Sequence, residues 1–283
     1  MRYLLVGGNG LLGRDIAEAL AGRDVDAPRR AELDITDADA VRSAVTGHDV
    51  VINSAAYTKV DAAEHEQAEA EAVNALGPEL LAAAAHAEGA RFVQISTDYV
   101  FRGDARSPYD EAEPVDPLGA YGRTKAEGER RASEASDGEL HIVRTAWLYG
   151  AHGDNFARTI ARKAAAGEPL RVVTDQVGQP TWSRDVAGRI VDMLDLELPA
   201  GIYHATNSGQ ASWYDFARAI VTSIGGDPDI VGSTDSSSFV REAERPVYSV
   251  LGHDGWTSTP LPPLRDWREA LAAATAAGVL ESR

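Results

Sequence analysis

Residues 3–13 of this 283-residue chain read YLLVGGNGLLG, and they predict how the fold begins. The apolar run at 3–6 has the composition of a buried strand, and residues 14–20 continue with the spacing of an amphipathic helix. Between them Gly7, Gly10 and Gly13 form the pattern GxxGxxG. Glycines placed in this way allow a tight turn and bring a pyrophosphate close to a helix N-terminus. The stretch therefore favours a dinucleotide site over a glycine-rich turn without a ligand.

The alternation of strand and helix continues through the first half of the chain. Apolar or β-branched runs near Val25 and at 49–53, 91–95 and 141–144 predict strands, with helix-forming stretches between them. This order is typical of an α/β fold with a Rossmann-type, doubly wound parallel sheet. Beyond residue 145 the alternation becomes irregular. We therefore expect an NAD(P)-binding domain at 1–145 and a smaller C-terminal substrate-binding lobe at 146–283, with some later elements returning to the first domain.

Composition excludes several classes of partner and site. Lys and Arg total 27 against 44 Asp and Glu, a net charge of −17, which repels nucleic-acid phosphates and anionic lipid surfaces. The chain has no Cys, so disulfides and thiolate metal sites are excluded. No run approaches the roughly 20 apolar residues of a membrane span, and the first apolar run is too short for a signal peptide. We expect a cytoplasmic monomer or homodimer with no nucleic-acid or membrane partner.

A second signature lies at 96–125. The predicted strand at 91–95 is followed by Ser96, Thr97 and Asp98, at the strand end where open α/β sheets bind ligands. Tyr121 and Lys125 share one face of a predicted helix. A nearby ammonium lowers the pKa of a phenol and suits it to proton transfer, and a Thr97 hydroxyl can hold a substrate oxygen. These residues suit carbonyl reduction with Tyr121 as proton donor, although a surface pair is the alternative for Tyr121 and Lys125 alone.

The region after the second strand bears on the cofactor. No acid stands clearly at the strand end to hold a ribose 2′-hydroxyl, whereas Arg29 and Arg30 follow and suit a 2′-phosphate. NADPH is therefore expected, with NADH possible, and two solvated loop arginines are the alternative. Asp34 and Ile35 are placed to flank an adenine ring, and the small residues after 53 permit close approach of a cofactor. The expected cofactor-binding residues are Gly7, Asn9, Gly10, Leu11, Leu12, Gly13, Arg30, Asp34, Ile35, Asn53, Ala55, Ala56, Tyr57, Tyr121 and Lys125.

Seven motifs in order carry a family resemblance. They are GGNGLLG at 7–13, NSAAYTKVD at 53–61, STDYVF at 96–101, YGRTK at 121–125, RTAWLY at 144–149, DQVGQPT at 175–181 and RPVYSVL at 245–251. Over essentially its full length the chain resembles an extended short-chain dehydrogenase/reductase and, more narrowly, the dTDP-4-dehydrorhamnose reductase family. The first and fourth motifs belong to the whole superfamily, whereas STDYVF and DQxGxPT are much narrower.

The resemblance implies NAD(P)H-dependent reduction of the C4 ketone of a dTDP-4-keto-6-deoxyhexose, most simply dTDP-4-dehydro-L-rhamnose. It places Thr97, Tyr121 and Lys125 in the catalytic positions, with Lys125 also holding the nicotinamide ribose. Core packing is the alternative for the aromatic residues among the expected contacts. The residues expected to bind the substrate are Thr58, Thr97, Asp98, Tyr99, Tyr121, Trp147, Gln179 and Arg245, the last two toward the diphosphate.

Metal binding and three other functions complete the expectations. Some members of the family bind Mg²⁺ through acidic residues, but Asp15 is shorter than the glutamate expected there and no acidic partner is evident, so we predict no required metal. The histidines lack the spacing of zinc ligands. The open alternatives are a 4-ketoreductase for another dTDP-deoxysugar, a regulatory subunit resembling the non-catalytic one of methionine adenosyltransferase, and a binder of NADP(H) without activity. Intact Thr97, Tyr121 and Lys125 weigh against the regulatory subunit, and the narrow motifs STDYVF and DQxGxPT weigh against the binder without activity.

Overall fold

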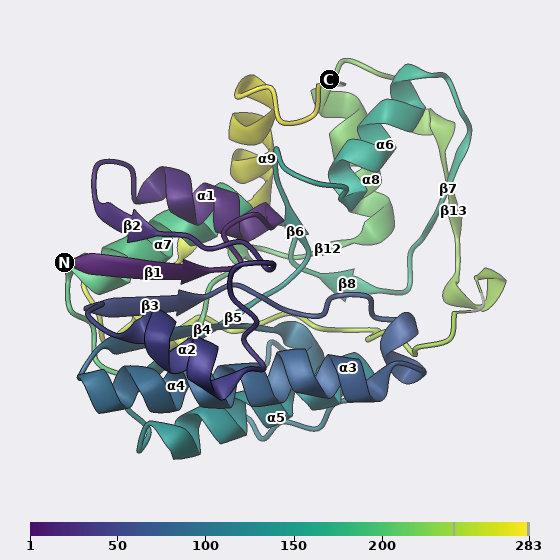
Figure 1. The fold of residues 1–283 in the computed structure, drawn as a ribbon. Coiled ribbons are helices and arrows are strands. Elements are labelled where there is room, and N and C mark those ends of the chain that lie inside the picture. Colours follow the sequence, from purple (N-terminus) through teal and green to yellow (C-terminus); the bar gives the residue numbers. More distant parts are fainter. Residues whose placement is uncertain (240, 282–283) are drawn as a thin grey trace.

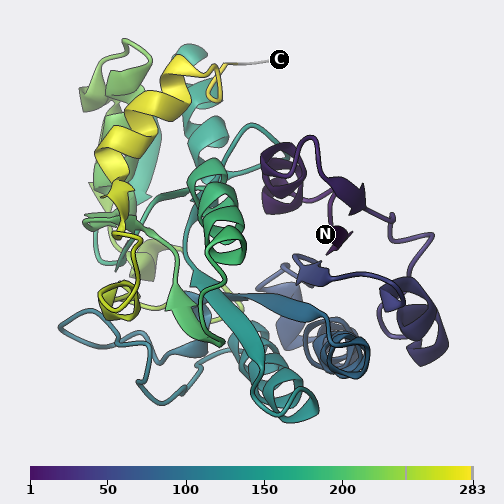
Figure 2. The same ribbon diagram turned by 90° about the vertical axis from the view of Figure 1, so that its left-hand side faces the viewer.

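The computed structural model describes residues 1–239 and 241–281. Within these ranges the largest sheet has six parallel strands in the order β10-β5-β4-β3-β1-β2 (Figures 1 and 2). Most strand residues are buried, because helices cover both faces. The Rossmann-type prediction is therefore confirmed. The strands are β1 (Arg2–Val6), β2 (Asp24–Asp26), β3 (Val50–Asn53), β4 (Arg91–Thr97), β5 (Leu140–Thr145) and β10 (Gly201–His204).

Two helix layers enclose the sheet (Figure 1). On one face α1 (Leu11–Ala19) packs against α7 (Ser183–Asp195), and Ile16 and Ile190 enter the core there. On the other face lie α2 (Ala38–Val45), α4 (Gly77–Glu88) and α5 (Ala120–Ala135), with Val41 and Leu81 in a second core. None of the helices in the described ranges is long and apolar enough to cross a membrane.

The second half of the chain builds a lobe beside the sheet and also returns to it (Figure 1). The lobe packs α6 (Phe156–Ala165), α8 (Trp213–Ser223) and α9 (Trp267–Ala276) around their own apolar core. Strand β10 pairs with β5, so residues beyond the predicted boundary at 145 also contribute to the main sheet. The boundary itself stays a prediction. Short strand pairs complete the lobe: β7 (Leu170–Val173) with β13 (Val231–Thr234), β6 (Leu148–Tyr149) with β9 (Thr181–Trp182), β8 (Val177–Gly178) with β12 (Ala211–Ser212), and β11 (Asn207–Ser208) with β14 (Leu264–Asp266).

Residues 60–74, one of the helix-forming stretches between the predicted strands, form three short pieces that run into α4. They are a 3₁₀ turn (Ala62–Glu64), α3 (Gln67–Glu71) and a π-helical turn (Ala72–Leu76). The wider π turn carries Asn74, whose buried amide accepts from Tyr57 N at 2.8 Å and donates to Tyr57 O and Thr124 Oγ1, each at 3.1 Å. The side chain thus ties the loop after β3 to α5.

Candidate active site

A cavity of about 830 Å³ lies at the carboxyl ends of β1, β3, β4 and β5. The chain leaves β1 for β2 on one side and crosses to β3 on the other, and open α/β sheets bind ligands at this switch point. Distant segments of sequence therefore meet here. The expected site residues that line the cavity are Gly7, Gly10, Leu11, Leu12, Arg30, Asp34, Ile35, Ala55, Ala56, Thr58, Thr97, Asp98, Tyr99, Tyr121, Lys125 and Trp147.

The glycine turn leaves room for an anion at the start of α1. Gly7 has φ +79°, which glycine adopts without strain, and a Cβ there would lie 2.7 Å from the Ser54 carbonyl carbon. Gly13 does not line the cavity, but a Cβ on it would lie 2.8 Å from Gly8 Cα. Gly10 is the N-cap of α1 and has no side-chain cap, so the first N–H groups of the helix are available. This geometry suits a pyrophosphate.

Besides Gly13, three expected cofactor residues do not line the cavity. Asn9 is exposed in the glycine turn. Asn53 is fully buried, where its amide donates to Gln94 Oε1 at 2.8 Å and accepts from Ala55 N at 3.1 Å. The Tyr57 hydroxyl donates to Glu66. The side chains of Asn53 and Tyr57 therefore shape the loop after β3, and their positions do not support direct contact with a cofactor.

The end of β2 carries an acid, Asp26, that the sequence analysis discounted. Its carboxylate already has partners within the protein. Asp26 accepts from Arg2 at 2.7 Å and contacts His48 Nε2 at 2.9 Å, and these two partners lower the pKa of its carboxyl. The Asp34 carboxylate accepts from Thr36 N and Oγ1 at 2.9 and 2.7 Å. Arg30 lines the cavity with its side chain 88% exposed. Its guanidinium lies 3.6 Å from Glu69 Oε1, and it is exposed enough to meet a 2′-phosphate here.

The hydroxyl, carboxyl and amine groups expected at the centre of the site lie together. Thr97 ends β4, and Tyr121 and Lys125 lie one turn apart at the start of α5. The Thr97 hydroxyl donates to Asp98 Oδ1 at 2.8 Å. The buried Lys125 ammonium donates to the Ile95 carbonyl at 2.7 Å. Thr97, Asp98, Tyr121 and Lys125 are referred to below as the Tyr121 cluster.

Burial shifts the proton affinities of the Tyr121 cluster. It raises the pKa of Asp98 to about 6, and Asp98 Oδ2 has no hydrogen-bond partner among the described residues. Burial and then the charge of Asp98 raise the pKa of Tyr121. Burial lowers the pKa of Lys125 to about 8, which the charge of Glu129 partly opposes. The expectation that Lys125 lowers the pKa of Tyr121 is therefore wrong for this structure, because loss of hydration dominates and Lys125 contacts a carbonyl.

A second buried cluster follows one helical turn later. Glu129 accepts from Arg144 Nη2 at 2.7 Å and Nε at 3.0 Å, and its Oε1 also accepts from the Ser96 hydroxyl. Ser96 and Arg144 lie opposite each other on β4 and β5. The guanidinium also lies over the Phe101 ring, 4.9 Å from its centroid. Ser96, Glu129 and Arg144, the Glu129 cluster, thus tie α5 to both strands behind the Tyr121 cluster.

Two residues expected at the substrate diphosphate lie outside the cavity. Gln179 is 2% exposed, and its amide donates to Leu251 O at 3.1 Å and accepts from Leu251 N at 2.8 Å and from Thr206 Oγ1 at 2.9 Å. Arg245 pairs with Asp61 at 2.8 Å. Both side chains hold the segment near 245–251 in place. Their positions do not support the expected substrate contacts.

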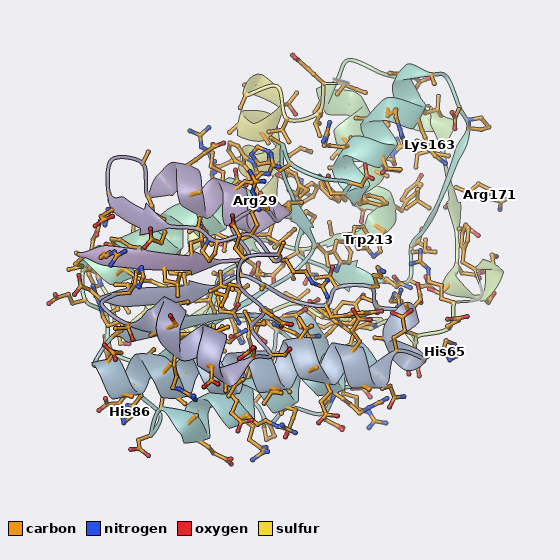
Figure 3. The ribbon with its side chains drawn as sticks, viewed as in Figure 1. Arg29, His65, His86, Lys163, Arg171 and Trp213 are labelled. Carbon is orange, nitrogen blue, oxygen red and sulfur yellow. The ribbon has the colours of Figure 1, made fainter. Side chains whose placement is uncertain are left out.

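One aromatic residue of the cavity was missed by the sequence analysis. Trp213, which Figure 3 labels, is the first residue of α8 and lines the cavity. Its ring stacks on Trp147 with centroids 3.5 Å apart and planes at 6°. Its local signature is a capping box between Ser212 and Asp215, which predicts a helix start but gives no reason to place Trp213 at the site. Only the fold brings it there.

Asp15, Glu18 and His152 place one oxygen or nitrogen atom each within 4.8 Å of one another. The sequence analysis did not connect His152 with Asp15. The Asp15 carboxylate accepts from the Ser183 hydroxyl, and burial raises the pKa of Asp15, which disfavours the ionised form that binds a metal. Acidic groups of this kind commonly hold no ion. The absence of a required metal stays a prediction.

Comparison with known proteins assigns the family. The family model for the RmlD substrate binding domain matches residues 1–279. A dTDP-4-dehydrorhamnose reductase of Streptomyces griseus is 48% identical over 278 residues, covering 95% of this chain and 91% of that protein. A probable dTDP-4,6-dihydroxy-2-methyloxan-3-one 4-ketoreductase of Streptomyces antibioticus is 47% identical over 284 residues, covering 97% and 94%. The solved structure of the Bacillus anthracis dTDP-4-dehydrorhamnose reductase in complex with NADP matches with a TM-score of 0.94 at 35% identity, covering 98% and 99%. The chain therefore belongs to the dTDP-4-dehydrorhamnose reductase family.

Proposed function

We propose that this chain reduces the C4 ketone of a dTDP-4-keto-6-deoxyhexose with NADPH, and that its substrate is dTDP-4-dehydro-L-rhamnose, which becomes dTDP-L-rhamnose. The observation that carries this proposal is that Thr97, Tyr121 and Lys125 meet in one cavity with the glycine turn. The Streptomyces griseus and Bacillus anthracis relatives bear the name of this reductase, which supports the choice of sugar.

The residues at the end of the cavity near the glycine turn and Arg30 fit NADPH. The turn at Gly7 and the uncapped start of α1 receive the pyrophosphate. Arg30 offers a guanidinium to a 2′-phosphate, whereas the acid at the end of β2, Asp26, is already paired and is not free for a 2′-hydroxyl. The Bacillus anthracis relative binds NADP in its solved structure. When bound, NADPH supplies the hydride that reduces C4.

Residues of the Tyr121 cluster handle the proton. Because burial raises the pKa of Tyr121, its phenol is protonated at neutral pH and donates that proton to O4 as negative charge develops there. The Thr97 hydroxyl, which donates to Asp98 in this structure, redirects that hydrogen bond to O4 and orients the ketone. Lys125, with a pKa of about 8, is cationic at neutral pH and stabilises the phenolate that remains. Hydride and proton together complete the alcohol.

A second sugar is favoured by one specific observation. The Streptomyces antibioticus relative, named for a different dTDP-sugar ketone, is 47% identical, whereas the Streptomyces griseus reductase is 48% identical. Overall similarity therefore does not separate the two substrates, since epimeric sugars are distinguished by a few pocket contacts. A 4-ketoreductase for another dTDP-deoxysugar is the second candidate.

The test is NADPH consumption with dTDP-4-dehydro-L-rhamnose, formed in place from dTDP-glucose by a 4,6-dehydratase and a 3,5-epimerase. A parallel reaction omits the epimerase, a third replaces NADPH with NADH, and Tyr121→Phe is the inactive control. We expect oxidation of NADPH only with the epimerase present, and dTDP-L-rhamnose as product. Oxidation without the epimerase would support the second candidate. No oxidation in any reaction would refute the rhamnose substrate and favour a rarer deoxysugar or a regulatory role.

A further inference from the structure

We propose that Trp213 is a substrate-binding residue, and that together with Trp147 it forms an aromatic wall against the deoxysugar ring of the nucleotide sugar. We further assign Gly178 as the residue that positions this wall. The inference rests on the proposed function, because it names the part of that substrate which the C-terminal lobe recognises.

The wall belongs to the cavity and closes one side of it. The Trp147 and Trp213 rings stack nearly parallel at 3.5 Å, and both residues line the cavity while only half-buried. Within the described ranges, Trp213 is the one cavity-lining residue that comes from beyond Leu148. Figure 3 shows Trp213 at the end of α8 nearest the sheet. Beyond β6, the C-terminal lobe therefore touches the cavity through this indole.

The position of the wall assigns it to the sugar. Thr97 on β4 pairs in register with Thr145 on β5, and Trp147 follows Thr145 by two residues. The wall thus begins beside the residue that holds the ketone oxygen. In a 6-deoxyhexose the carbon next to C4 bears the C6 methyl group, so an apolar surface lies beside the reacting carbon. Burial of that surface against indole rings is favourable, whereas the diphosphate lies on the far side of the sugar.

The wall is held in place by glycine packing. Trp147 has φ +44°, a conformation that a bulky residue adopts only where its surroundings impose it. A Cβ on Gly178 would lie 2.6 Å from Trp147 Nε1, so only glycine leaves room for the indole. Gly178 pairs with Ala211, close to the start of α8, and Phe156 packs on Trp213 at 4.5 Å between ring centroids. The DQVGQPT motif thus serves the site through Gly178 instead of Gln179.

The first test is ligand binding by Trp213→Ala. Titration calorimetry on the NADP⁺-saturated protein would compare dTDP-L-rhamnose with dTDP, which lacks the sugar. We expect about tenfold weaker binding of dTDP-L-rhamnose, from the loss of one aromatic contact, and unchanged binding of dTDP. Tyr214→Ala is the matched control, because Tyr214 is the next residue of α8 and does not line the cavity. A melting curve shows whether each variant folds.

Each other outcome has a definite meaning. If the variant binds dTDP-L-rhamnose and dTDP more weakly by the same factor, the wall contacts thymidine, and the assignment to the sugar is overturned. Unchanged binding of both would overturn Trp213 as a contact. If the wild-type protein binds neither ligand, the proposed function fails and the wall with it, a result visible before any variant is made.

A second pair of variants keeps the proposal testable if Trp213→Ala does not fold. Gly178→Ala forces Trp147 away from its position, whereas Gly232→Ala in β13 places a Cβ no closer than 3.4 Å to any neighbour. We expect Gly178→Ala, and not Gly232→Ala, to weaken the binding of dTDP-L-rhamnose about tenfold. It should also reduce the near-ultraviolet circular dichroism of the two stacked indoles. If Gly178→Ala retains both the affinity and the spectrum, Gly178 does not position the wall.

Discussion

The Tyr121 cluster and the Glu129 cluster include Lys125 and Glu129, which lie one turn apart on α5. Both clusters are largely buried, and they differ in how their charges are paired. Glu129 accepts from both the Arg144 guanidinium and the Ser96 hydroxyl. In the Tyr121 cluster, Asp98 keeps one oxygen without a partner among the described residues, and the Lys125 ammonium contacts a carbonyl instead of a carboxylate. The same helix therefore carries residues of one cluster whose charges are paired and of one cluster whose charges are not.

This difference separates a structural cluster from a reactive one. A buried charge is costly, and paired charges offset that cost while an unpaired group changes its pKa instead. The pKa values of Asp98 and Lys125, about 6 and about 8, bracket neutral pH, where groups that exchange protons are useful. The paired Glu129 cluster gives the neighbouring reactive groups a rigid support. Variants of the two clusters should therefore affect different properties.

Tyr121→Phe should produce the largest effect, confined to catalysis. Loss of the proton donor is expected to lower kcat by about 10³-fold or more, because general acid catalysis contributes on that scale. The NADPH dissociation constant, measured by fluorescence titration, should change little. Tyr203→Phe is the matched control, since its hydroxyl donates to Pro199 O and the residue does not line the cavity. Near-normal kcat in Tyr121→Phe would remove Tyr121 from the acid role.

Glu129→Gln should affect stability most. It leaves the Arg144 guanidinium buried without its carboxylate, which is expected to lower the free energy of unfolding by about 3–5 kcal/mol. Glu127→Gln on the same helix removes two partly exposed ion pairs, with Arg130 and Arg131, and should cost less than about 1 kcal/mol. Urea unfolding followed by circular dichroism measures both. Equal losses in the two variants would contradict the structural role of the Glu129 cluster.

Asp98→Asn should stabilise the protein, and only above a certain pH. Because the folded state raises the pKa of Asp98 from 3.8 to about 6, it binds the proton more tightly than the unfolded chain does. The free energy of unfolding therefore falls as pH rises through this window, by about 3 kcal/mol at most. We expect Asp98→Asn to raise the free energy of unfolding by about 1–3 kcal/mol at about pH 8 and to leave it unchanged at about pH 4. The gain stays modest because the new amide nitrogen, in place of Oδ2, also lacks a partner. A gain independent of pH would contradict this reading of Asp98.

Local sequence patterns predicted the sheet and the reactive groups. The runs that form β1, β3, β4 and β5 are mainly apolar and mostly buried, as strands covered on both faces require, and Gly7, Gly10 and Gly13 belong to one continuous strand–turn–helix stretch. Thr97, Tyr121 and Lys125 follow directly from strand and helix ends. Such features depend on neighbours in sequence, so composition and spacing suffice to find them.

Features set by tertiary packing could not be predicted in this way. Trp213 reaches the cavity only because β12 pairs with β8, two strands of two residues each that carry no periodic signal. Tyr57 and Gln179 lie in motifs of the site, yet their side chains turn toward Glu66 and Leu251. The direction of the Tyr121 pKa shift depended on burial, which outweighed the lysine that the spacing made evident.

The smallest expected effect couples the two clusters. Glu129 carries the negative charge that partly opposes the lowering of the Lys125 pKa by burial. Removing that charge in Glu129→Gln should lower the Lys125 pKa further, so the proton is lost at lower pH and the alkaline limb of kcat/KM moves to lower pH. Relative to the wild-type protein, the kcat/KM of Glu129→Gln should fall about two- to threefold more at about pH 8 than at about pH 6.5. Glu127→Gln, at a partly exposed position of the same helix, should leave the alkaline limb in place. If Glu129→Gln lowers activity equally at all pH values, the Glu129 cluster acts on the site through structure alone, and the charges of the two clusters are independent.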